Sequence, residues 1–231
     1  EPHINLGAGG GTQAEQTSAI MIGYEKAIQD FKPDLCIVVG DVTSTMACSI
    51  VAKKAWIKVA HIEGGIRSGD MTMPEEVNRI VTDSITDYFF TTTELANINL
   101  RKQGVKEDQL FLVGNTMIDS LLSNLNRIEK PDFFEEQNLE TKKYIVATLH
   151  RPSNVDDPKN LELLLGLIND NSGNNKVIFP MHPRTRKVFD TIQRSFDKLF
   201  ICGPMEYLQF IYLIKNCLGV ITDSGGITEE T

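Results

Sequence analysis

The sequence predicts an α/β protein built on doubly wound parallel sheets. Short apolar runs alternate along the chain with longer stretches of helical periodicity. Repeated strand-helix units of this kind are typical of parallel sheets with right-handed crossovers. The polar, charged stretch 129–142 interrupts the alternation, and we expect it to be a hinge between two domains. The 231 residues are enough for two domains of ordinary size.

Eight strands are predicted, four in each half. Each is a short apolar run that ends at polar or glycine residues, as expected for buried strands of a parallel sheet. The predicted strands are 35–39, 57–62, 88–91, 110–113, 144–149, 176–181, 199–202 and 218–222. The predicted helices are 13–30, 45–54, 74–85, 94–103, 116–127, 160–168, 185–195, 207–216 and one starting near 227.

Local signals fix several helix starts. Thr12 and Glu15 form a capping box, which makes the glycine-rich stretch 7–11 an entry loop in preference to a phosphate loop. Thr43 or Ser44 is expected to cap the next helix. The helix that begins at Pro74 has apolar residues at helical spacing, and we expect them to form its core stripe. They are Val77, Ile80, Val81 and Ile85.

Composition excludes several classes of protein. The 41% hydrophobic and 23% charged content is that of a soluble globular protein, and no apolar run is long enough to span a membrane. Residues 1–20 lack the features of a signal peptide. The net charge of −8 argues against nucleic-acid binding. The four cysteines are scattered, which favours reduced thiols in a cytoplasmic protein over a zinc site.

Three carboxylates in the first half are candidate catalytic residues. Asp41 and Glu63 each follow a predicted strand, and Glu75 begins a helix. In a parallel sheet these positions converge on one edge, where like charges raise some pKa values and supply proton donors and acceptors. Two simpler interpretations remain open: Asp41 caps the following helix, and Glu75 forms a surface ion pair with Arg79.

The second half contains a candidate anion pocket. Ser224, Gly225 and Gly226 connect a strand to a helix, where backbone N–H groups can approach a phosphate. An ordinary strand-to-helix turn explains these residues equally well. His150 and His182 both end strands beside arginines, which favours an anion pocket over a structural role.

Ordered motifs along the whole chain resemble the non-hydrolysing UDP-N-acetylglucosamine 2-epimerases. The matching segments are Gly40-Asp41-Val42-Thr43-Ser44-Thr45, His61-Ile62-Glu63-Gly64-Gly65-Ile66-Arg67-Ser68, Pro74-Glu75-Glu76-Val77-Asn78-Arg79, Gly114-Asn115-Thr116-Met117-Ile118-Asp119, His150-Arg151, His182-Pro183 and Asp223-Ser224-Gly225-Gly226-Ile227-Thr228-Glu229-Glu230.

The resemblance implies a glycosyltransferase-B-like fold of two Rossmann-like domains, with the site in the interdomain cleft. The first domain, 1–130, would carry the acids and lack its first strand, and the second, 142–231, would bind UDP. The implied reaction interconverts UDP-N-acetylglucosamine and UDP-N-acetylmannosamine at C2, by UDP elimination to 2-acetamidoglucal and re-addition. The resemblance implies no cofactor and no metal.

The family's functional positions fall on identifiable residues of this chain. The implied catalytic residues are Asp41, Glu63, Glu75 and His150. The implied substrate-binding residues are Arg79, Arg151, His182, Phe210 at the uracil, Ser224, Gly225, Gly226 and Glu230 at the ribose. Taken alone, Phe210 is an ordinary core residue of its helix.

The resemblance also sets expectations for the whole protein. It implies a UDP-sugar substrate, a homodimer and a role in cell-envelope polysaccharide biosynthesis. The family's opening strand and closing segment are not found here, so we expect a fragment that lacks both ends. Alternative functions are a hydrolysing epimerase, a sugar transferase of the same fold, or an inactive UDP-sugar-binding fragment. A modified sugar, such as a diacetamido-uronate, is a further alternative substrate.

Overall fold

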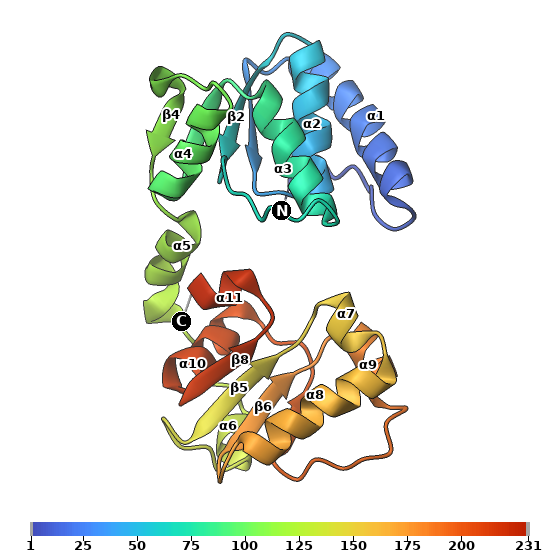
Figure 1. Ribbon diagram of the computed structural model, residues 1–231, viewed down its shortest axis with the longest axis vertical. Helices are drawn as coiled ribbons and strands as arrows, with labels where there is room; N and C mark the ends of the chain where they lie inside the picture. The colour runs from blue at the N-terminus through green and yellow to red at the C-terminus, as the bar shows by residue number, and fades with distance from the viewer. Residues whose placement is uncertain (1, 230–231) are drawn as a thin grey trace. The chain divides into compact units, whose positions relative to one another are not determined.

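The computed structural model describes residues 2–229, and its contacts divide the chain into two compact units (Figure 1). Unit 1 ends at Thr116 and unit 2 begins at Met117. This division lies before the stretch 129–142, in which the sequence predicted the hinge. The roles expected for the two halves stay predictions. Within the described residues, no helix is both long and apolar enough to cross a membrane.

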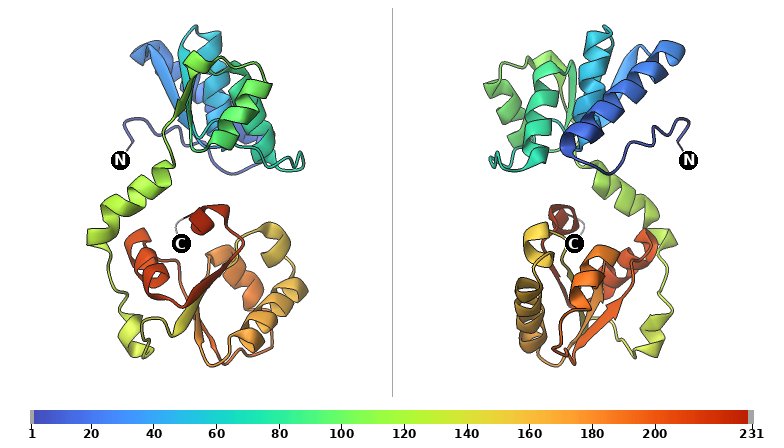
Figure 2. Two further views of the ribbon diagram at one scale, coloured as in Figure 1. Left: turned by 60° about the vertical axis from the view of Figure 1, so that its left-hand side comes forward. Right: turned by 90° about the vertical axis from the view of Figure 1, so that its right-hand side faces the viewer.

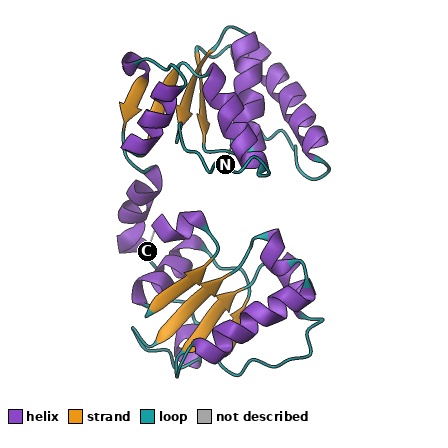
Figure 3. Cartoon of the chain, in the orientation of Figure 1, coloured by secondary structure: helices purple, strands orange, loops and turns teal. Residues whose placement is uncertain are grey.

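Unit 1 is a four-stranded parallel sheet in the order β1-β2-β3-β4, with helices between the strands (Figure 3). The register places Val38 beside His61 and Ile62 beside Phe90. The strands are β1 Leu35–Val39, β2 Lys58–Ile62, β3 Tyr88–Thr91 and β4 Leu110–Leu112. The helices are α1 Gln13–Phe31, α2 Thr43–Lys54, α3 Pro74–Ile85, α4 Glu94–Lys102 and the short η1 Glu107–Gln109.

One face of β1 is packed and the other is open. Cys36 and Val38 point into a core with Val59 of β2 and Ala52 of α2. The alternate residues on β1 are exposed, and β1 has β2 as its sole strand neighbour in the described part of the chain. These exposed residues are Leu35, Ile37 and Val39.

Of the caps predicted for α1 and α2, the first is present and the second is not. The capping box of α1 is confirmed: the Glu15 N–H donates to Thr12 Oγ1 at 3.2 Å, and the Thr12 N–H donates to Glu15 Oε2 at 2.7 Å. The cap predicted for α2 is wrong, because α2 follows Val42 and has no side-chain cap. The hydroxyl of Thr45 donates instead to the carbonyl of Val39, at 2.7 Å.

The core stripe predicted for α3 is also wrong. Val77 is 39% exposed, and the buried residues of this helix are polar. They are Glu76, Asn78, Thr82 and Asp83. The physical reason is that α3 hydrogen-bonds to the turns at the ends of β1 and β2, where backbone groups need polar partners.

Unit 2 is a second parallel sheet, in the order β7-β6-β5-β8. The strands are β5 Tyr144–Thr148, β6 Lys176–Pro180, β7 Leu199–Cys202 and β8 Gly219–Thr222. The helices are α5 Thr116–Asn124, η2 Leu125–Arg127, α6 Phe133–Glu136, α7 Pro152–Val155, α8 Pro158–Asn171, α9 Pro183–Phe189, α10 Tyr207–Asn216 and α11 Gly225–Glu229.

Helices cover both faces of the second sheet, as a doubly wound fold requires (Figure 2). Leu161 and Leu165 of α8 pack with Phe179 on one face. On the other face, Phe134 and Leu139, from the stretch expected to be a hinge, pack in the core with Leu213 of α10. The stretch 129–142 is therefore anchored to this sheet.

Candidate functional site

Two of the predicted acids lie on neighbouring turns of unit 1. Asp41 follows Gly40 directly after β1, and Glu63 directly follows β2. A Cβ atom placed on Gly40 would lie 3.6 Å from Glu63 Oε2, so the Glu63 carboxylate faces the turn that carries Asp41. The parallel pairing of β1 with β2 produces this approach, as the sequence predicted.

Glu63 has a left-handed backbone, with φ of 71°. Only glycine adopts this conformation without steric cost, so another residue here is under strain. The Glu63 N–H is held by the carbonyl of Phe90 on β3, at 2.9 Å. The fold therefore fixes Glu63 in a costly conformation at the edge where the acids gather.

Arg79 of α3 joins the Asp41 turn to the buried end of its own helix. Its Nη2 donates to Asp41 Oδ2, and its Nη1 donates to Glu76 Oε2 at 3.0 Å. Both simpler interpretations of the acids are therefore wrong. Asp41 pairs with Arg79 and does not cap α2, and no ion pair forms between Glu75 and Arg79.

Glu76 is the buried carboxylate of this region, at 2% exposure. It accepts the backbone N–H of Ser68 at 2.9 Å and of Gly69 at 3.1 Å, and the Ser68 hydroxyl at 3.0 Å. Burial raises its pKa, but these hydrogen bonds and that from Arg79 outweigh burial and lower it to about 2. Glu76 is thus a fixed anion that holds the loop after β2.

Glu75 lies at the start of α3 beside a pocket of about 460 Å³. Its half-buried side chain makes no hydrogen bond or ion pair within the described residues. The neighbouring Asn78 donates to the Asp41 carbonyl at 2.8 Å, which places the first turns of α3 against the Asp41 turn. The pocket lining also includes Gln13, Thr43 and Ser44.

Two buried polar residues contact the backbone of these turns and were not predicted from the sequence. His61 of β2 and Asp83 of α3 contact each other through Nδ1 and Oδ1 at 2.7 Å. His61 begins one of the motifs that carry the family resemblance, but no function was predicted for it. In the part of the chain that the structure describes, no three His, Cys, Asp or Glu side chains are placed to hold a metal ion.

Asp223 organises the candidate site of unit 2, a role that sequence reasoning also missed. Its carboxylate accepts the backbone N–H groups of His150 at 3.1 Å and Arg151 at 3.0 Å, and the Asn154 amide at 2.9 Å. His150 Nδ1 lies 2.6 Å from Asp223 Oδ1. Burial raises the pKa of Asp223, but these hydrogen-bond donors and the His150 charge lower it by more. The net effect is a pKa below the usual value of an aspartate.

Several predicted substrate-binding residues line one pocket of about 390 Å³ where β5 and β8 end. Arg151, Ser224 and Gly225 line it together with Asp223. The Arg151 Nε donates to the Asp223 carbonyl at 2.8 Å, so its side chain lies along the turn. Gly226 follows in α11, where a Cβ atom would lie 3.2 Å from Met117 Cε.

The remaining predicted residues of unit 2 lie outside this pocket lining. His182 is exposed at the start of α9, and its Nδ1 accepts the Arg184 N–H at 3.2 Å. Arg184 itself pairs with Asp156 at 2.6 Å. Phe210 is partly buried against the core beneath α10. Glu230, expected at a ribose, lies outside the described residues.

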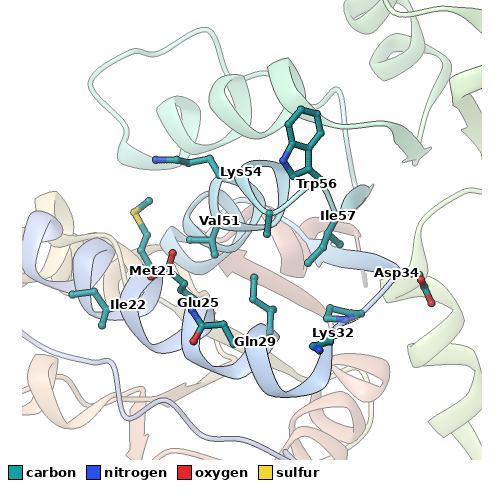
Figure 4. Close-up of a pocket in the computed structure, with 13 residues that line it drawn as sticks. Met21, Ile22, Glu25, Gln29, Lys32, Asp34, Val51, Lys54, Trp56 and Ile57 are labelled. Carbon is teal, nitrogen blue, oxygen red and sulfur yellow. The ribbon is translucent and has the colours of Figure 1, made fainter.

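A larger hollow of about 790 Å³ lies in unit 1 (Figure 4). Residues of α1, of the turn before β1 and of the end of α2 line it, including Met21, Gln29 and Val51. Trp56, 96% exposed, stands at its edge. These segments lie at the amino ends of the strands, whereas the acids lie at the carboxyl ends, so this hollow is not the candidate site.

The family model for UDP-N-acetylglucosamine 2-epimerase matches residues 1–231 of the chain. The chain belongs to this family. The UDP-N-acetylglucosamine 2-epimerase homolog of Methanococcus maripaludis is 42% identical over 99% of this chain. The UDP-2,3-diacetamido-2,3-dideoxy-D-glucuronate 2-epimerase of Pseudomonas aeruginosa is 36% identical over 100% of it. The chain spans 65% and 64% of these two relatives.

Solved structures give the same assignment. The crystal structure of the Methanocaldococcus jannaschii UDP-GlcNAc 2-epimerase, in complex with UDP-GlcNAc and UDP, matches with a TM-score of 0.87 at 40% identity. The match covers 100% of this chain and 66% of that one. The predicted fold class is confirmed: this chain has two parallel four-stranded sheets with helices between the strands, an α/β fold of the glycosyltransferase-B type that matches this epimerase structure.

Proposed function

We propose that the protein interconverts UDP-N-acetylglucosamine and UDP-N-acetylmannosamine by inverting C2. The observation that carries the proposal is the Asp41, Glu63 and Glu75 group at the strand ends of unit 1. These acids sit on two adjacent turns and on the helix that hydrogen-bonds to them. Family membership and the UDP-GlcNAc complex of a relative support the choice of substrate.

The proposed reaction is an elimination followed by the reverse addition. The bond from C1 to the UDP oxygen breaks, a carboxylate takes the C2 proton, and the electron pair of the C2–H bond forms the C1–C2 double bond of 2-acetamidoglucal. UDP then adds back at C1 while a proton arrives on the opposite face of C2. Positive charge develops on the ring as the C1–O bond breaks, and nearby carboxylates stabilise it.

We assign the proton acceptor to Glu75. It lines a pocket, and its carboxylate has no partner in the described part of the chain, whereas Asp41 is paired with Arg79. A base needs an unoccupied lone pair within reach of the proton it removes. Asp41 and Glu63 then supply the proton to the opposite face of C2 and stabilise the positive charge on the sugar ring.

Unit 2 supplies the proposed nucleotide site. Asp223 on Nδ1 fixes the orientation of His150, whose exposed ring leaves Nε2 available to a diphosphate oxygen. Arg151 and the Ser224 turn line the pocket of about 390 Å³ and supply a guanidinium and backbone N–H groups. His182, Phe210, Gly226 and Glu230 complete the proposed contacts to UDP.

Incubation of the natural full-length gene product with UDP-GlcNAc in deuterated water tests the function. We expect UDP-ManNAc and deuterium at C2 of both sugars, because the departing proton exchanges with solvent before re-addition. Free ManNAc with UDP would indicate a hydrolysing enzyme, and no turnover would indicate a binding protein. The same assay with UDP-2,3-diacetamido-2,3-dideoxy-D-glucuronate tests the substrate that the Pseudomonas relative's name gives.

The substitution Glu75→Gln tests the proposed base. We expect turnover to fall at least about a hundredfold while UDP binding, measured by titration calorimetry, stays unchanged. The reason is that the amide keeps the size of the side chain but cannot accept the C2 proton. Glu25→Gln, on the exposed side of α1, is the matched control. Unchanged turnover in the Glu75 variant would contradict the assignment.

A further inference from the structure

His61 is fully buried in β2, and both nitrogens of its ring have partners. Its exposed fraction is 1%. Nδ1 lies 2.7 Å from Asp83 Oδ1, and Nε2 lies 2.8 Å from the carbonyl oxygen of Gly40. The ring of His61 therefore connects the turn after β1 to α3.

The partners determine where the ring hydrogens lie. The Gly40 carbonyl can only accept, so Nε2 carries a hydrogen and donates it. Asp83 Oδ2 accepts the Gly65 N–H at 3.0 Å, and Arg67 Nη2 forms an ion pair with the same oxygen at 2.6 Å. Both contacts favour the ionised carboxylate of Asp83. An ionised carboxylate needs a donor opposite Oδ1, so Nδ1 carries a hydrogen as well.

This network fixes both turns that carry the candidate acids. Gly40 precedes Asp41, and Gly65 follows Glu63 after one residue. Gly65 has φ of 83°, and a Cβ atom there would lie 2.5 Å from the Ala96 carbonyl oxygen, so this turn has no room to shift toward α4. The chain of contacts from Gly40 through His61 and Asp83 to Gly65 ties the two turns together.

We propose that His61 is a positioning residue, held as an imidazolium, that sets the separation between Asp41 and Glu63. The inference rests on the proposed function. It assigns His61 no contact with substrate. Asp83 of α3 is the charged group that contacts the ring, Arg67 of the loop after β2 pairs with Asp83, and the Asp41–Arg79 pair lies beyond Gly40. The imidazolium also places a positive charge behind the acids.

The ring nitrogens give a direct test that does not depend on activity. The chain has four histidines, so nitrogen NMR of protein labelled at histidine gives few signals. The His61→Asn spectrum identifies the His61 signals by their loss. Near neutral pH we expect both His61 nitrogens to be protonated. A bare Nδ1, as in a neutral ring facing a protonated Asp83, would overturn the proposal.

The substitution Asp83→Asn separates the charge from the hydrogen bonds. The amide can donate to Nδ1 and accept from Gly65, so the contacts persist around a neutral ring. We expect an unchanged circular dichroism spectrum and a ring signal with only Nε2 protonated. A His61 ring that stays doubly protonated in the Asp83→Asn variant would contradict the inference. A ring that is singly protonated in the unmodified protein would also contradict it.

The kinetic test uses the full-length gene product. For His61→Asn we expect kcat to fall about a hundredfold with little change in KM, because the acids lose their spacing while the nucleotide pocket is untouched. For Asp83→Asn, which keeps the contacts and removes the charge, we expect a smaller fall in kcat. His3→Asn, at an exposed residue, is the control. An unchanged kcat overturns the role. If the unmodified protein shows no epimerisation, the proposed function fails, and the ring signals still decide the state of His61.

Discussion

The neighbouring residues Glu75 and Glu76 illustrate how environment separates two identical side chains. Glu75 borders a pocket without a partner in the described residues, whereas Glu76 is buried and accepts hydrogen bonds from Ser68, Gly69 and Arg79. A carboxylate with that many donors is held ionised and is a poor base. The sequence alone does not separate them, because both sit in the first turn of one helix.

Glu76→Gln should destabilise unit 1 by about 2–3 kcal/mol, because an amide presents N–H groups to the donors of Ser68 and Gly69. Urea unfolding followed by circular dichroism measures the change. Glu25→Gln, on exposed α1, serves as the control and should change stability by less than about 0.5 kcal/mol. A loss as small as that of the control would show that the buried carboxylate is not needed.

The pH dependence of stability follows from the same residue. The pKa of Glu76 falls from 4.5 to about 2 on folding. A depressed pKa contributes stability that is complete above the unfolded value and is lost as pH falls through the folded value. We therefore expect Glu76 to contribute about 3 kcal/mol above pH 4.5, lost progressively toward pH 2. Glu76→Gln should flatten this part of the unfolding curve.

At the scale of elements, α3 packs with its polar side inward. Its partners are turns with unpaired carbonyl and N–H groups, so Asn78 and Asp83 serve better there than aliphatic side chains. Asn78→Leu should cost about 1–3 kcal/mol, because the Asp41 carbonyl loses its donor. Val77→Thr, at a 39% exposed position, should cost less than about 0.5 kcal/mol. The reverse order in urea unfolding would contradict this packing.

The sequence predicted the elements with apolar cores and failed where tertiary contacts are polar. β1, β3 and β7 begin and end where the apolar runs do. The prediction of the inward face of α3 was wrong, because helical periodicity takes account only of apolar residues. It cannot detect the turns against which a helix packs. The adjacency of Asp41 and Glu63 was predictable from parallel topology. The hydrogen-bond networks around Asp83 and Asp223 were not predictable, because their partners include backbone groups that only the fold brings close.

At the scale of the whole molecule, the two units should respond separately to UDP. Each unit has its own sheet and core. If UDP binds at the Ser224 turn, a concentration of 100 times its Kd stabilises unit 2 by about 2.7 kcal/mol. Hydrogen exchange should then slow in β5, β6 and β8 of this chain and remain unchanged in β1 and β2. Equal protection of both sheets would contradict independent units.

The open side of β1 has a consequence for the behaviour of this chain in solution. Its outer edge presents backbone donors and acceptors in extended form, next to the uncovered side chains of Leu35, Ile37 and Val39. Such an edge accepts any extended segment as a fifth strand, including one from another molecule. Concentrated samples are therefore prone to growth of sheets between molecules, and a lysine at Ile37 would supply the repulsion that natural edge strands use against it.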